Sequence, residues 1–214
     1  MSPEDLAAKH PYLYHVTDSR NLPGIKRYGL LPTSSLLSKY EVPCADRAEI
    51  ERRRRPDSVT LTQPDYGTAI ITDNAPLSET KLMNCLDDGL SPGDWLALLN
   101  QRFFFWPDEK SREGFLNARI NWERDRLVLV LDTLSVARRH GEQMELSAIN
   151  SGSTLRRPAR RGLCTFTPLL RHDYATWRRL RGKLDHIREV AVVGGVDRVD
   201  DHLIEHYVAP GRAL

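Results

Sequence analysis

The sequence predicts one α+β domain that spans residues 1–214. Short runs of β-branched and aromatic residues are separated by segments with helix caps, and the order lacks the regular βαβ alternation of a doubly wound sheet. No repeat, low-complexity tract or obvious linker divides the chain. We therefore expect a single compact unit, with a mainly helical insertion over about residues 73–100.

The strands are predicted from short apolar runs. Leu13 to Thr17 is aromatic and β-branched and is followed directly by helix signals, so it reads as a buried strand. Phe103 to Trp106 is a dense aromatic run ended by Pro107, and Leu127 to Leu131 is continuously apolar. The predicted strands are 13–17, 58–62, 68–72, 103–106, 127–131, 144–149, 189–193 and 203–208.

The helices are predicted from their caps. Asn21 precedes Pro23 in a first turn, and Gly29 ends the same segment. Ser91 is followed by proline and then by Asp94, which lies near the positive end of the helix dipole. The predicted helices are 22–28, 41–55, 78–89, one from 91, one from 107 to about 119, 135–140, and one from 173 to about 180.

The composition is that of an ordinary folded protein, with 40% hydrophobic and 28% charged residues. No apolar stretch approaches the roughly 20 residues that span a bilayer, and the acidic start of the chain is unlike a signal peptide. Cys44, Cys85 and Cys164 are too widely spaced for a metal-binding pair or a disulfide framework. We expect a cytoplasmic protein without membrane association.

Arginine clusters are the main charge feature of a chain whose net charge is only +2. They occupy 52–55, 156–161 and 178–181. A guanidinium group binds phosphate with two parallel hydrogen bonds, so such clusters suit nucleotides or a nucleic-acid backbone. The alternative for each cluster is a solvated surface.

Three blocks of sequence carry a family resemblance. The first is Tyr14-His15-Val16-Thr17 with Asn21 to Ile25 and Tyr28 to Leu31 after it, the second is Phe103 to Pro107, and the third is Ile187 to Val192. In this order they resemble the ADP-ribosyltransferase superfamily, closest to the DarT-like DNA-modifying toxins and more distantly the tRNA 2′-phosphotransferases. The chain also resembles an uncharacterised bacterial family with a Tyr-His pair and a late Ile-Asn-Ser-Gly-Ser-Thr segment.

The resemblance implies a fold and an activity. The fold would be a split β-sheet core of two roughly orthogonal sheets that form an NAD cleft, with helices outside. The activity would be transfer of ADP-ribose from NAD, as substrate, to a nucleic acid (DNA favoured) or a protein. A toxin or defence effector with a cognate antitoxin would fit this activity.

The resemblance also implies roles for individual residues. Glu189 would be the catalytic carboxylate, because cleavage of the nicotinamide–ribose bond passes through an oxocarbenium-like species that a carboxylate stabilises. His15 would position the adenosine ribose, and Thr17 could reach a ribose or the carboxamide. The ring that stacks on nicotinamide would be Phe115, where the resembling families have tyrosine, or else Trp106.

Phosphate contacts are expected from two segments. Within the run 52–55 we choose Arg54, although the sequence does not distinguish the four arginines. Asn150 and Ser151 begin a small polar segment whose backbone N–H groups could hold a phosphate, with Arg156 and Arg157 adjacent.

Each of these residues has a structural alternative. His15 could be a core histidine, Glu189 an exposed residue at a strand end, Asn21 a simple helix cap, and Phe103 to Trp106 core packing. The segment from Asn150 to Thr154 could be a turn. The functional alternatives are a catalytically silent nucleotide- or nucleic-acid-binding module, an NAD glycohydrolase, or an enzyme that processes a 2′-phosphate.

No metal site is expected. His202 and His206 lie four residues apart, but in a predicted strand and without the glutamate of the metalloprotease pattern.

Overall fold

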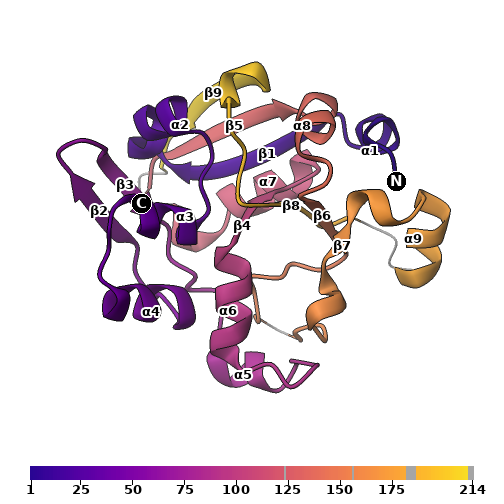
Figure 1. Ribbon diagram of the computed structural model, residues 1–214, viewed down its shortest axis with the longest axis horizontal. Coiled ribbons are helices and arrows are strands. Elements are labelled where there is room, and N and C mark those ends of the chain that lie inside the picture. The colour runs from indigo at the N-terminus through magenta and orange to yellow at the C-terminus, as the bar shows by residue number, and fades with distance from the viewer. Residues whose placement is uncertain (123, 156, 182–186, 212–214) are drawn as a thin grey trace.

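Three antiparallel β-sheets organise the computed structural model, which describes residues 1–122, 124–155, 157–181 and 187–211. The α+β class predicted from the sequence is confirmed, because strands and helices are mixed and every pairing between named strands is antiparallel. Figure 1 shows one sheet across the top of the molecule, a second in the middle and a hairpin at the left.

The first sheet has the order β1-β5-β9. Its strands are β1 (Tyr12–Asp18), β5 (Arg126–Asp132) and β9 (Leu203–Ala209). His15 pairs with Leu129, and the central strand β5 is buried along almost its whole length. Burial on both faces explains why β5 reads as a continuous apolar run rather than an alternating one.

The second sheet has the order β4-β8-β6-β7. Its strands are β4 (Arg102–Phe105), β8 (Glu189–Val193), β6 (Met144–Ser147) and β7 (Thr167–Pro168). An isolated bridge between Tyr14 and Trp106 joins it to the first sheet. The two sheets therefore meet where β1 passes the end of β4.

The third sheet is the hairpin of β2 (Val59–Gln63) and β3 (Gly67–Ile71). The side chain of Asn21 attaches it to β1. Its Nδ2 group donates to Thr17 Oγ1 and Ile70 O, and its Oδ1 atom accepts from Ile70 N. Asn21 is the N-cap residue of α2, as predicted, but its side chain makes no cap bond to that helix and bonds to β1 and β3 instead.

Helices surround the sheets. They are α1 (Pro3–Lys9), α2 (Leu22–Tyr28), α3 (Thr33–Lys39), α4 (Cys44–Arg52), α5 (Glu79–Met83), α6 (Pro92–Asn100), α7 (Glu109–Leu116), α8 (Thr133–His140) and α9 (Tyr174–Arg181). Figure 1 shows α4, α5 and α6 below the sheets and α9 at the right edge.

Several predicted boundaries need correction. The helix predicted over 41–55 is only Cys44–Arg52, and the helix predicted over 78–89 ends at Met83. Helices α1 and α3 and the short strand β7 were not predicted. The strand at 189–193 is confirmed at both ends, and the capping box of Ser91 and Asp94 is present.

Candidate functional site

A cavity of about 300 Å³ lies where β1, β3 and β4 approach α2, α3 and α6. We call it the central cavity and define it by five of its lining residues, which are His15, Thr17, Ile70, Asn100 and Phe103. Its volume is at the lower end of the roughly 300–1,000 Å³ typical of small-molecule sites. It is mainly apolar with a few polar groups, as such sites are.

His15 lies in the wall of the central cavity with a defined hydrogen-bonding state. Its Nδ1 atom lies 2.9 Å from the carbonyl oxygen of Phe104. Because a carbonyl oxygen only accepts, Nδ1 carries the proton. Burial lowers the pKa of the ring to about 4, so His15 is neutral at pH 7 and its Nε2 atom can accept a hydrogen bond from a ligand hydroxyl.

Thr17 also lines the central cavity, two residues further along the same face of β1. Its hydroxyl oxygen accepts from Asn21 Nδ2, which also holds the hairpin. Asn21 therefore connects the position of His15 and Thr17 to the position of β3 on the other side of the cavity.

The arginine run at 52–55 divides into two kinds of position. Arg53 extends outward at the lower edge of the molecule, and Arg54 donates to the carbonyl oxygens of Leu77 and Ala75. Arg55 instead lines the central cavity. Of the four arginines, the structure brings Arg55 and not Arg54 to the cavity, because the chain turns away from α4 after Arg52.

Arg55 is a partly buried cation that forms no ion pair with a carboxylate of the described residues. Its guanidinium group donates to Ile50 O and to Asn100 Oδ1, and its Nε atom is buried without a hydrogen-bond partner. Burial lowers its pKa to about 10, which leaves it charged at neutral pH. An anionic group in the cavity would compensate this charge.

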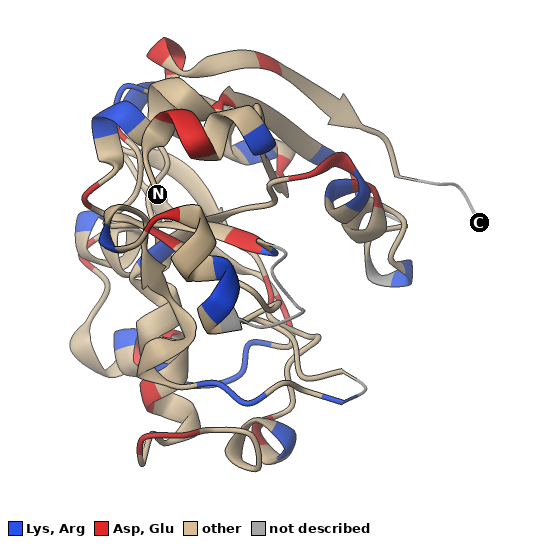
Figure 2. Ribbon diagram, turned by 90° about the vertical axis from the view of Figure 1, so that its right-hand side faces the viewer, with Lys and Arg blue, Asp and Glu red and all other residues tan. Residues whose placement is uncertain are grey.

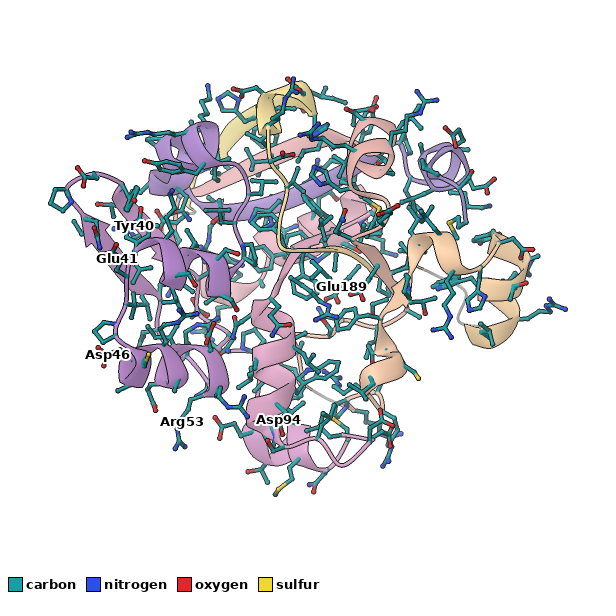
Figure 3. The ribbon with its side chains drawn as sticks, viewed as in Figure 1. Tyr40, Glu41, Asp46, Arg53, Asp94 and Glu189 are labelled. Carbon is teal, nitrogen blue, oxygen red and sulfur yellow. The ribbon has the colours of Figure 1, made fainter. Side chains whose placement is uncertain are left out.

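Glu189 is a buried carboxylate near the centre of the molecule (Figure 3). Both of its carboxylate oxygens lie 3.1 Å from Ser151 N, which donates to them. Burial raises the pKa of Glu189 to about 7, while the hydrogen bonds from Ser151 and the nearby charge of Arg161 act in the opposite direction. A carboxyl group with such a pKa is characteristic of functional sites.

Glu189 does not itself line the central cavity. Ser151, its hydrogen-bond donor, precedes Gly152, which is part of the wall. Strand β4 links His15 to the strand of Glu189. The carbonyl oxygen of Phe104 in β4 accepts from His15, and Phe104 pairs with Ala191, two residues after Glu189 in β8. The alternative of an exposed strand-end carboxylate is wrong for Glu189, because its exposed fraction is 8%.

Two backbone N–H groups of the segment from Asn150 to Thr154 are already bonded to other parts of the protein. Ser151 N donates to Glu189, and Thr154 N donates to Pro76 O. Asn150 is exposed and lies outside the cavity wall, and Arg156 lies outside the described residues. The expected phosphate-binding role of Asn150 and Ser151 therefore needs correction, because the segment positions Glu189 instead.

Phe115 and Trp106 pack against each other, with ring centroids 4.7 Å apart. They belong to a cluster with Tyr14 and Val16, which point to the face of β1 opposite His15. Neither ring, predicted to stack on nicotinamide, lines the central cavity. Strand alternation turns Tyr14 and Val16 to the far face of β1, and Phe115 from α7 and Trp106 pack against them there.

Phe103 and Phe104 do line the central cavity, and Tyr28 and Tyr40 join them from the helical side. The ring centroids of Phe103 and His15 lie 4.2 Å apart. The aromatic run was expected to be core packing. Phe103 lies on a strand directly paired with the strand that carries Glu189, and local sequence does not show this pairing.

The residues that the structure describes contain neither a candidate metal site nor a candidate membrane-spanning helix. No group of three or more His, Cys, Asp or Glu side chains there could hold a metal ion. Within the same residues, no helix has the length and apolarity needed to cross a membrane. Figure 2 shows basic and acidic residues interspersed along the ribbon, in keeping with the small net charge.

Comparison with protein families finds that residues 11–203 match the model of DUF7002, a family of unknown function. The matched range covers all of the strands β1 to β8 and the walls of the central cavity. A search of curated proteins finds no match.

Proposed function

The chain belongs to the DUF7002 family of unknown function, and we propose that its members use the central cavity to bind NAD and transfer ADP-ribose to a nucleic acid or protein. The observation that carries the proposal is His15, a neutral imidazole fixed in the wall of a cavity where two antiparallel sheets meet. This arrangement agrees with the split-sheet fold and NAD cleft that the sequence resemblance implies.

His15 would orient the dinucleotide. With Nδ1 bonded to Phe104 O, its Nε2 atom accepts a hydrogen bond from a ribose hydroxyl. Thr17, on the same face of β1, supplies a hydroxyl two residues away. Neither group changes its charge near pH 7, so this part of the site would bind a neutral sugar equally well across that range.

Arg55 and Phe103 would take the roles first assigned to Arg54 and to Phe115 or Trp106. The guanidinium group of Arg55 suits a phosphate oxygen of the pyrophosphate, because a buried guanidinium gains most from an anionic partner. Phe103 offers an aromatic ring in the cavity wall for stacking with nicotinamide or adenine.

Glu189 would stabilise positive charge on the ribose during cleavage of the nicotinamide bond. The transferred carbon becomes oxocarbenium-like as nicotinamide leaves, and an ionised carboxylate nearby lowers the energy of that state. In this proposal the segment containing Ser151 and Gly152 moves aside so that Glu189 reaches the ribose.

The test is NAD consumption with labelled NAD and single-stranded DNA, RNA and lysate protein as acceptors. Glu189→Gln keeps the shape of the side chain and removes its charge, so we expect turnover to fall about 100- to 1,000-fold with little change in NAD affinity. Because the pKa of Glu189 is about 7, wild-type turnover should rise between about pH 6 and pH 8.

The matched control is Glu205→Gln, an equal change on the exposed strand β9. Equal losses in both variants would indicate a folding defect rather than a catalytic role. Absence of NAD binding by the wild-type protein would refute the proposal as a whole.

Glu189 is bonded to Ser151 and does not line the central cavity, and this position favours a second function, nucleotide binding without catalysis. A protein that binds a nucleotide in the central cavity without turning it over would show the same His15 and Arg55 geometry. NAD binding in calorimetry, with no product from any acceptor and no free nicotinamide, would identify this binding module. Release of nicotinamide without a labelled acceptor would instead identify an NAD glycohydrolase.

A further inference from the structure

A second cavity of about 200 Å³ lies at the other face of the first sheet, beside the start of β5. We call it the β5 pocket and define it by Asn117, Asn121, Trp122, Arg124 and Arg126, with Leu116, Ala209 and Pro210 completing the wall. None of these residues lines the central cavity. The pocket is smaller than the roughly 300–1,000 Å³ of typical small-molecule sites, so it suits a compact group.

Arg126 is the unusual residue of the β5 pocket. Its exposed fraction is 3%, yet its two bonds from Nε and Nη2 both go to one neutral acceptor, Asn121 Oδ1, at 3.1 and 2.7 Å. A guanidinium group carries five N–H donors, so one amide oxygen satisfies only part of it. Its guanidinium carbon also lies 6.0 Å from the ring centroid of Phe115.

The charges around Arg126 do not balance locally. Of the carboxylates that influence it, Asp73 is paired with Arg124 at 2.7 Å and Asp18 with Arg20 at 2.8 Å. Within the described part of the chain, Arg126 itself has no carboxylate within ion-pair distance. Burial and the like charge of Arg124 both lower the pKa of Arg126, which shows that its charge is held in an unfavourable environment.

From this geometry we propose that the β5 pocket binds a phosphate group through Arg126, with Arg124, which is paired with Asp73, as the second cation in its wall. Phosphate fits because two arginines in the wall of a small polar cavity match its several oxygens and its negative charge. The group would come from free phosphate or a nucleotide, or from a nucleic-acid strand. This inference is independent of NAD binding in the central cavity.

Trp122 makes the proposal directly measurable. Its indole N–H, which donates to Asn117 O at 3.0 Å, lies in the pocket wall, whereas the indole of Trp95 lies in a different core cluster. The indole resonances of the four tryptophans can be followed by NMR, and the spectrum of Trp122→Phe assigns the one from the pocket. Inorganic phosphate is titrated against chloride at constant ionic strength.

We expect a saturable shift of the Trp122 resonance and none of the Trp95 resonance. Arg126→Gln and Arg124→Gln should each weaken phosphate binding by at least about tenfold, because each removes charged hydrogen bonds. Arg138→Gln makes the same charge change on an exposed residue of α8, beyond the opposite end of β5, and should leave binding unchanged. If Arg126→Gln does not fold, the phosphate affinity of Arg124→Gln tests the proposal.

Two further ligands distinguish the source of the phosphate. Binding of a short oligonucleotide more tightly than a mononucleotide indicates a strand, and equal affinity indicates a free phosphate or nucleotide. A Trp122 resonance that does not shift with phosphate would overturn the proposal. So would an equal phosphate affinity of wild type and the folded Arg124→Gln and Arg126→Gln variants.

Discussion

His15 illustrates how a single hydrogen bond determines what a side chain can offer a ligand. Its bond to Phe104 O uses the only ring N–H of the neutral imidazole, and its pKa of about 4 keeps it neutral. The exposed nitrogen is then an acceptor throughout the physiological pH range. A protonated histidine in the same place would instead repel Arg55 across the cavity.

The prediction at this scale is that His15→Ala weakens NAD binding by about 1–3 kcal/mol, the cost of leaving a polar partner unpaired. The loss should be the same at pH 6 and pH 8, because His15 does not titrate between them. Calorimetry at both pH values measures it, with His206→Ala on the exposed strand β9 as control. Unchanged affinity in a folded His15→Ala protein would remove His15 from the site.

At the scale of elements, the hairpin β2–β3 depends on Asn21 for its position. One amide side chain makes three hydrogen bonds, two of them to the backbone of Ile70 at 2.7 and 3.0 Å. The hairpin forms one wall of the central cavity through Thr68 to Ile71. A two-stranded sheet is marginally stable alone, so the bonds from Asn21 determine the position of the hairpin in the cavity wall.

Asn21→Ala should therefore lower the free energy of unfolding by about 2 kcal/mol or more, since it leaves Ile70 N and Ile70 O without these partners. Urea denaturation measures the effect. The control Asn84→Ala removes an exposed amide at the end of α5 and should stay within about 0.5 kcal/mol of wild type. A similar small change for Asn21→Ala would show that the hairpin is held by other contacts.

At the scale of the whole molecule, Glu189 affects how stability depends on pH. Its folded-state pKa of about 7 lies above the ordinary value of 4.5. A carboxyl group with a raised pKa stabilises the folded state fully below the ordinary value, and this contribution is lost as pH rises toward the folded value. Protonated Glu189 is thus the more stable form in the core.

We predict that wild type loses up to about 3 kcal/mol relative to Glu189→Gln between pH 4.5 and pH 8, since one pKa unit corresponds to about 1.4 kcal/mol. Urea denaturation of both proteins at several pH values measures the difference. Comparing the two proteins cancels the opposite trend from His15, whose lowered pKa costs stability as pH falls below about 6.5. A constant difference across the range would mean that Glu189 is not held in a desolvating site.

The sequence by itself determined the class of the fold and the position of most strands. Buried apolar runs such as 127–131 and caps such as Ser91 with Asp94 act locally, so neighbouring residues are enough to predict them. It also identified His15, Thr17 and Glu189 as residues to examine, and two of these line the central cavity.

Only the tertiary structure decided which side chains share a site. Phe115 and Trp106 pack on the face of β1 opposite His15, and the end of α4 at Arg52 brought Arg55 rather than Arg54 to the cavity. Asn21 bonds to Ile70, 49 residues away, instead of capping its own helix. These outcomes depend on contacts between distant segments, whose energies a local pattern does not contain.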